Sequence, residues 1–223
     1  MKSGPDQWSA IDEFIGGLLI PSDPGFDHAL EASEKAGLPP IQVSPCQGKF
    51  LQLLAQLSGA RKILEIGTLG GYSTLWLARA LPAGGHLITL ELDPRHAEVA
   101  RANFEGAGLS ALIELRVGPA IESLPTLHAE HSGPFDFIFI DADKPGTPEY
   151  FAWALKLARP GTLIVVDNVI RKGALIDASN PDPAVQGMRR FIEVLSKESR
   201  VTATVLQTVG NKGYDGFALA VVR

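Results

Sequence analysis

The sequence predicts an α/β fold built on a doubly wound, mostly parallel sheet of seven strands, with helices on both faces and one antiparallel strand near the C-terminal end. Three observations predict it. A short apolar run at residues 62–66 breaks into the glycine-rich turn 67–71 and leads into a helix-like segment at 75–81. Apolar runs and helical patterns then alternate along the chain. The last two apolar runs, 201–208 and 216–222, are joined by a Gly/Asn/Lys turn with no room for a helix, so they pair antiparallel. This arrangement is Rossmann-like.

Three helices are predicted before the first strand, at residues 7–19, 24–36 and 47–58. The second ends where Gly37 is followed by two prolines, a common stop signal. We therefore divide the chain into an N-terminal helical extension, residues 1–40, and a main domain, residues 41–223. The extension is expected either to cover the site or to pack on another subunit.

The main domain is expected to continue as alternating strands and helices. The remaining predicted strands are 87–91, 112–117, 135–140 and 162–166, and the helices are 94–106, 120–129, 148–157 and a long one ending near 197. A loop rich in Gly, Asp, Asn and Pro spans residues 171–183. In such sheets a ligand binds beyond the carboxyl ends of the strands, so polar residues there are candidates for function.

Composition narrows the class of protein. The chain has 223 residues, 45% of them hydrophobic, and a net charge of −5, which does not favour nucleic acid as the main partner. Its single cysteine, Cys46, allows no internal disulfide and suits a reducing, cytoplasmic setting, with a packing role favoured over a nucleophilic one. Without an apolar run of about 18 residues, no membrane span is expected.

The glycine-rich turn indicates a nucleotide-like ligand. Glu65 lies just before the turn, where a carboxylate would repel a pyrophosphate but attract an ammonium or sulfonium group. The pattern G-x-x-G-G also differs from the G-x-G-x-x-G of nicotinamide enzymes. A plain structural turn packing a helix on the sheet is the alternative. Glu91 ends the second strand and is well placed to accept the hydroxyls of a ribose, unless it is an ordinary solvated acid.

Oxygen-bearing side chains follow two later strands. Asp141, Asp167 and Asn168 are ligands of the kind that Mg²⁺ prefers, and their strands are expected to be neighbours. Capping of the following helices and turns is the alternative role. Lys144, three residues after Asp141, is a candidate general base beside such a cation, or else a solvated loop lysine.

These motifs together resemble the cation-dependent O-methyltransferase family, which contains catechol O-methyltransferase and the plant caffeoyl-CoA O-methyltransferases. The resemblance covers roughly residues 40–223 and is closest to the small bacterial members. It rests on V-S-P-C-Q-G at 43–48, the run 63–74, G-P-A at 118–120, D-A-D-K at 141–144 and D-N at 167–168.

The resemblance implies a role for each matching residue. S-adenosylmethionine would be the cofactor, with Asp141, Lys144 and a divalent cation at the reaction centre. The implied cofactor-binding residues are Val43, Glu65, Gly67, Thr68 and Ser73 for the amino-acid part, Glu91 for the ribose, Pro119 and Ala120 for the adenine, and Asp141. The implied metal ligands are Asp141, Asp167 and Asn168, with Mg²⁺ expected and Mn²⁺ or Ca²⁺ as alternatives, and the implied catalytic residues are Lys144 and Asp141.

The resemblance also implies a homodimer acting on a small hydroxylated aromatic or vicinal-diol substrate. The chain departs from the plant enzymes at residues 169–173, V-I-R-K-G, and its following loop is short, which argues against a coenzyme A thioester. Arg171 and Lys172 either meet an acidic substrate or form a solvated pair. Two other functions stay open: methylation of a hydroxylated tRNA base, and binding of S-adenosylmethionine without catalysis, which the intact metal-ligand set argues against.

Overall fold

A single seven-stranded sheet organises the molecule, and its order is β3-β2-β1-β4-β5-β7-β6. The structure, a computed structural model, describes residues 4–223. The strands are β1 (Lys62–Ile66), β2 (His86–Glu91), β3 (Ile113–Val117), β4 (Phe135–Ile140), β5 (Ala158–Asp167), β6 (Val201–Gly210) and β7 (Gly213–Val222). Strand β7 alone runs antiparallel to its neighbours, β5 and β6, so the predicted topology is confirmed.

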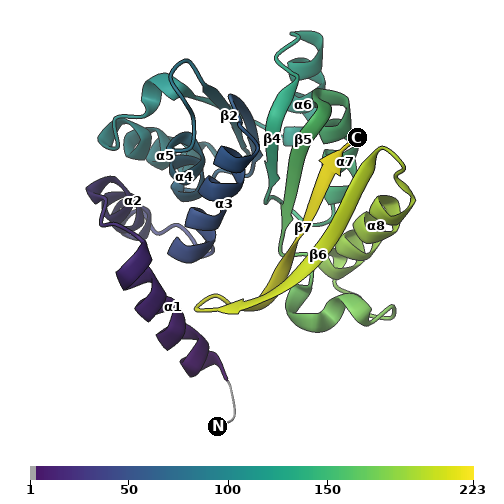
Figure 1. The fold of residues 1–223 in the computed structure, drawn as a ribbon, viewed down its shortest axis with the longest axis horizontal. Coiled ribbons are helices and arrows are strands. Elements are labelled where there is room, and N and C mark those ends of the chain that lie inside the picture. The colour runs from purple at the N-terminus through teal and green to yellow at the C-terminus, as the bar shows by residue number, and fades with distance from the viewer. Residues whose placement is uncertain (1–3) are drawn as a thin grey trace.

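Helices cover both faces of the sheet (Figure 1). They are α1 (Pro5–Leu19), α2 (Pro24–Lys35), α3 (Pro45–Leu57), α4 (Tyr72–Ala78), α5 (Pro94–Gly106), α6 (Ala120–Ala129), α7 (Thr147–Leu157) and α8 (Pro183–Lys197), with short 3₁₀ segments η1 (Ser110–Leu112) and η2 (Arg171–Ile176). Buried residues of α6, α7 and α8 form one apolar core with the sheet, and those of α2 to α5 form a second. The molecule is therefore a three-layer sandwich.

Most predicted element boundaries agree with the structure to within a few residues. The largest difference is in β5, which begins at Ala158 rather than residue 162, and the helix after the glycine-rich turn begins at Tyr72 rather than residue 75. Its N-cap, Gly71, has a left-handed φ of 83°, and a Cβ there would lie 2.4 Å from the Phe104 ring. The chain can therefore enter the helix at once only with glycine at this position. At its other end, bonds from Ala80 to Leu77 and from Leu81 to Ala78 tighten the chain into i→i−3 turns.

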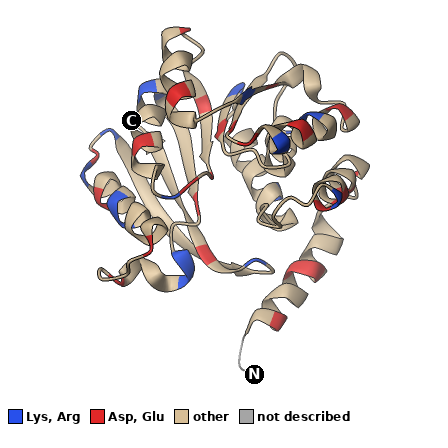
Figure 2. Ribbon diagram, turned by 180° about the vertical axis from the view of Figure 1, so that it is seen from behind, with Lys and Arg blue, Asp and Glu red and all other residues tan. Residues whose placement is uncertain are grey.

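The predicted N-terminal extension contains two helices that pack differently. Helix α2 buries Phe26 and Ala29 against α4 and α5, whereas α1 has no buried residue. Figure 1 shows α1 projecting away from the sheet and meeting the tip of the β6–β7 hairpin. There the backbone N–H of Asn211 donates to Asp12 Oδ2 at 2.8 Å. Helix α1 carries no lysine or arginine (Figure 2).

Within residues 4–223, no helix combines the length and the apolar character that a membrane span needs.

Candidate active site

A cavity of about 590 Å³ opens at the carboxyl ends of β1, β2, β4 and β5 and contains most of the predicted site residues. The predicted residues that line it are Val43, Gly67, Thr68, Ser73, Glu91, Pro119, Ala120, Asp141, Lys144 and Asn168. The two predicted residues outside the lining, Glu65 and Asp167, are buried, at 0% and 4% exposure. The fold thus brings the predicted set to one place, with these two acids behind the cavity wall.

The adjacent ends of β1, β2 and β4 form one wall of the cavity. Ile66 O accepts a hydrogen bond from Asp141 N at 2.9 Å, and Gly67 N donates to Leu90 O at 3.0 Å. Gly67 has φ of 100°, and a Cβ built on it would lie 2.1 Å from Asp141 O. Only glycine permits this approach, so the first glycine of the turn sets the position of the Asp141 carboxylate.

Glu91 holds the glycine-rich turn in place. Its Oε2 accepts the backbone N–H groups of Thr68 at 3.1 Å and Leu69 at 2.7 Å, while Oε1 accepts that of Asp93 at 2.9 Å. His96 Nδ1 lies 3.4 Å from Oε1. The side chain therefore has a structural task, and because each carboxylate oxygen offers two lone pairs, it can also accept a ligand hydroxyl from the cavity.

Glu65 is fully buried beneath the turn and is surrounded by hydroxyl groups. Ser73 Oγ donates to its Oε1 at 2.7 Å, Thr89 Oγ1 donates to its Oε2 at 2.7 Å, and Thr74 Oγ1 donates to the same oxygen. Burial raises the pKa of Glu65 to about 7; the three hydroxyls lower it and Asp141 raises it further. Among these partners Ser73 lines the cavity, so Glu65 faces the cavity through that hydroxyl.

Two carboxylates and a lysine meet at the neighbouring ends of β4 and β5. Lys144 Nζ lies 2.6 Å from Asp141 Oδ1. Burial and the nearby Asp141 carboxylate raise the pKa of Asp167 to about 7. Asp167 also accepts hydrogen bonds from Gln47 Nε2 at 2.6 Å and from the backbone of Asn168 at 2.8 Å. The strands β4 and β5 are neighbours, as predicted, and their ends bring Asp141, Lys144 and Asp167 close together.

The donors at this point suit a hard cation. Asp141 and Asp167 lie close together and Asp167 is buried, so the ionised form of both carboxylates is disfavoured unless a cation neutralises them. The side-chain oxygens of Asp141, Asp167 and Asn168 are also ligands of the kind that Mg²⁺ prefers. No cluster of three or more His, Cys, Asp or Glu side chains arranged for a metal occurs within residues 4–223. The predicted set differs from such a cluster because its third member is an amide.

Some residues lie at the site although the sequence assigned them no role there. Gln47 reaches Asp167 from the first turn of α3, and His96 and Tyr150 line the cavity. Tyr150 packs in the core and also donates its hydroxyl to Asp143. Helical spacing places these side chains on a face but does not say which strand end they reach. Arg171, for which the sequence left open a contact with an acidic substrate, also lines the cavity.

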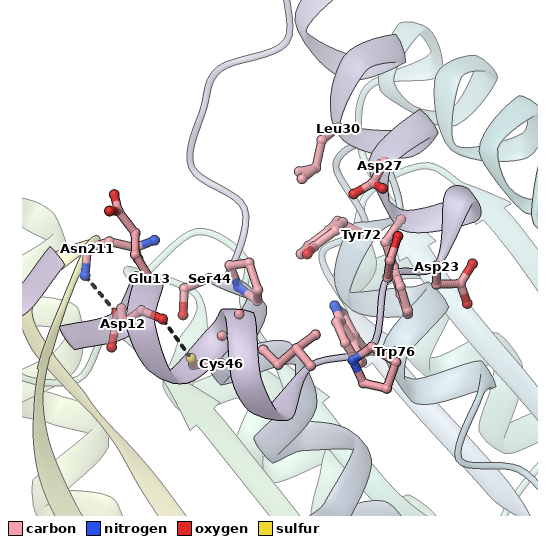
Figure 3. A pocket seen from close by; sticks show the side chains of 17 residues that line it. Asp12, Glu13, Asp23, Asp27, Leu30, Ser44, Cys46, Tyr72, Trp76 and Asn211 are labelled. Atoms are coloured by element: carbon pink, nitrogen blue, oxygen red, sulfur yellow. Dashed lines mark hydrogen bonds between the residues drawn. The ribbon is translucent and has the colours of Figure 1, made fainter. Parts of the chain in front are cut away.

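A second cavity of about 470 Å³ lies between α1, α2 and the start of α3 (Figure 3). Tyr72 belongs to the walls of both cavities. Cys46 lines the second one, with its Sγ 3.8 Å from the backbone oxygen of Asp12. Burial and Asp12 raise the pKa of the Cys46 thiol, which favours the neutral thiol and agrees with a packing role rather than a nucleophilic one.

Comparisons with known proteins agree with this geometry. The family model for O-methyltransferases matches residues 25–221. The chain is 56% identical over 216 residues to a catechol O-methyltransferase of Niastella koreensis, covering 97% of this chain and 98% of that protein. It is 51% identical to a catechol O-methyltransferase of Mycobacterium tuberculosis, covering 96% and 95%.

Solved structures are similar over the whole chain. An O-methyltransferase from Bacillus cereus in complex with SAH superposes with a TM-score of 0.97 at 55% identity, covering 99% of this chain and 100% of that one. The O-methyltransferase TomG from Streptomyces achromogenes, involved in tomaymycin synthesis and in complex with SAM, superposes with a TM-score of 0.96 at 51% identity, covering 99% of both chains.

Proposed function

The chain belongs to the O-methyltransferase family, and on this premise we propose that it moves the methyl group of S-adenosylmethionine to a hydroxyl of a small catechol-like or vicinal-diol substrate with the help of a divalent cation. The observation that carries the proposal is the meeting of Asp141, Lys144 and Asp167 at one end of a cavity whose other walls are the glycine-rich turn and Glu91.

The methyl donor is assigned to the part of the cavity formed by the turn. Glu91 accepts the ribose hydroxyls, Pro119 and Ala120 face the adenine, and Ser73 with the backbone of Val43 holds the amino-acid end. Glu65 acts from behind Ser73, and its carboxylate favours the cationic ammonium and sulfonium of the donor.

The acceptor is assigned to the end of the cavity near Lys144. Asp141, Asp167 and Asn168 would hold the divalent cation, which when bound lowers the pKa of a neighbouring hydroxyl. Lys144, which Asp141 holds in place, acts as the general base: its neutral amine accepts the proton of that hydroxyl. The acceptor oxygen then attacks the methyl carbon in line with the sulfur, so a C–O bond forms, the C–S bond breaks, and S-adenosylhomocysteine leaves. The main contribution of the protein is to position the two reactants.

Residues 1–40 are assigned to dimer formation and to covering the acceptor site. Helix α1 exposes Phe14 to 70%, Leu18 to 68% and Ile11 to 47% of their surface, although all three lie along one face of the helix. Such a contiguous apolar face on a projecting helix favours burial against a second copy of the chain. A two-fold contact through α1 would make this face self-complementary.

Methyl transfer to a panel of catechols tests the proposal. The purified chain is assayed with S-adenosylmethionine and Mg²⁺, then with excess chelator, and we expect the transfer to disappear with chelator. Lys144→Ala should lower kcat by at least about tenfold with little change in the KM for S-adenosylmethionine, since only the proton acceptor is lost. Lys197→Ala, at an exposed position in the last turn of α8, is the control.

The outcomes separate the parts of the proposal. Transfer that survives chelator would leave Asp141, Asp167 and Asn168 a structural role only. A Lys144→Ala variant within about threefold of the wild-type rate would remove Lys144 as the base. Binding of S-adenosylmethionine with no transfer to any catechol would favour the two other functions, methylation of a hydroxylated tRNA base or cofactor binding without catalysis.

A further inference from the structure

Arg171 is a cation at the edge of the acceptor site, and its side chain has no partner among residues 4–223. It begins η2, three residues after Asn168, and lines the same cavity as Asp141 and Lys144. Its Nε–H is buried and has no acceptor among residues 4–223. The ion pairs of that part of the chain also do not include it. A buried donor of a charged group that lacks an acceptor is costly, so the side chain is suited to a ligand.

Two other arginines that are partly buried have acceptors in the protein. Arg189 donates through Nη1 to the backbone oxygen of Leu175 at 2.6 Å. Arg116 contacts Glu114 at 2.6 Å and Glu130 at 2.8 Å. The fold therefore supplies acceptors to these guanidinium groups, whereas the Nε–H of Arg171 has none among residues 4–223. The difference indicates that the partner of Arg171 comes from outside the chain.

The backbone around Arg171 is held in an uncommon conformation. Arg171 has φ of 53°, in the left-handed region that side chains other than glycine rarely adopt. Asp215 keeps it there, because its Oδ1 accepts the backbone N–H groups of Ile170 at 2.9 Å, Arg171 at 3.0 Å and Gly216 at 3.0 Å. Strain that neighbouring groups maintain at a cavity wall is typical of functional positions.

We infer that Arg171 binds a carboxylate carried by the acceptor substrate, so that the preferred acceptors are hydroxylated aromatic acids rather than neutral catechols. This inference rests on the proposed function. The hydroxyls would lie near Lys144 and the carboxylate near Arg171, and the aromatic ring would span the distance between them. A planar guanidinium matches a carboxylate with two parallel hydrogen bonds, which a neutral ester cannot reproduce.

Pairs of acceptors that differ only in this charge give the test. We would measure kcat/KM for 3,4-dihydroxycinnamate and for its methyl ester, each with S-adenosylmethionine and Mg²⁺, and take the ratio of acid to ester. The wild type is expected to favour the acid by about ten- to a hundredfold. Arg171→Met should bring the ratio close to one, chiefly through the KM of the acid, and Arg171→Lys should keep part of the preference because it keeps the charge.

Lys172→Met is the matched control, since Lys172 is the next residue, is exposed and has a similar φ of 55°. It should leave the ratio at the wild-type value. A wild-type ratio near or below one would overturn the inference, as would a ratio that Arg171→Met does not change. A higher KM for S-adenosylmethionine in Arg171→Met, with an unchanged ratio, would instead assign the arginine to the cofactor carboxylate. Absence of transfer to both acceptors and to unsubstituted catechol would refute the proposed function itself.

Discussion

Replacing Gly67 by alanine should damage both the fold and the site, and the structure allows the size of the effect to be worked out. The new Cβ would lie 2.1 Å from Asp141 O and 2.8 Å from Asp141 C. These are backbone atoms just beyond the adjacent ends of the parallel strands β1 and β4, so no side-chain rotation relieves the contact. The strand ends must separate, which disrupts the 2.9 Å hydrogen bond between Asp141 N and Ile66 O.

Three contributions make up the expected loss. A Cβ in the left-handed region costs about 1–2 kcal/mol. The lost hydrogen bond costs about 1 kcal/mol, and overpacking against the backbone adds about 1–3 kcal/mol. Gly67→Ala should therefore lower the free energy of unfolding by about 3–6 kcal/mol, and because Asp141 moves with its backbone, kcat should fall as well.

Gly213→Ala is the control variant, because it introduces the same backbone strain as Gly67→Ala without the steric clash. Gly213 has φ of 90°, close to the 100° of Gly67, but a Cβ on it would meet nothing within 4 Å. It should lose only the about 1–2 kcal/mol of strain. Urea unfolding of the wild type and both variants gives the comparison. If Gly67→Ala loses no more stability than Gly213→Ala, the close approach of the two strands is not what requires glycine.

Two further predictions concern Glu65 and α1. The folded protein holds the pKa of Glu65 near 7, above its ordinary value of 4.5, so the ligand-free wild type should lose about 3 kcal/mol of stability as pH rises between these values, the loss being complete above about 7. Glu65→Gln cannot ionise and should lack this loss, and parallel urea-unfolding profiles at pH 5 and pH 8 for the two proteins would contradict the reasoning. Phe14→Asp places a charge in the exposed apolar face of α1 and should shift the chain toward monomer in sedimentation velocity, whereas Phe14→Leu should not; an unchanged distribution in Phe14→Asp would exclude this face as the dimer contact.

The sheet could be predicted from the sequence because its signals are local. The alternation of strands and helices predicts a parallel sheet. The last two strands are joined by a turn too short for a helix, so they can only pair antiparallel. The packing of α1 could not be predicted in the same way. Its apolar stripe resembles that of any buried helix, but within the monomer the stripe has no partner surface and Phe14 stays exposed. Periodicity shows that a face is apolar and leaves open which surface covers it.

The sequence predicts that the site lies at the carboxyl-end edge of the sheet, but it does not predict the contacts between the residues of the site. Asp141 and Asp167 follow apolar runs, so their strand ends are visible in the sequence. The amide of Gln47, 120 residues away from Asp167 along the chain, reaches that carboxylate only because α3 packs beside the sheet. The missing partner of Arg171 is equally a property of three-dimensional packing, since the sequence contains 25 acidic residues that might have paired with it.

Strand geometry explains why Glu65 differs from the other acids. Glu91 and Asp167 are the last residues of their strands, but Glu65 lies one residue inside β1. Successive side chains of a strand point to opposite faces, and Glu65 is in register with Thr89 of β2. Its carboxylate therefore points into the layer of α4, where it meets Thr89, Ser73 and Thr74. Glu65, inside its strand, therefore holds Ser73 and Thr74 in the first turn of α4, whereas Glu91, at the end of its strand, lines the cavity.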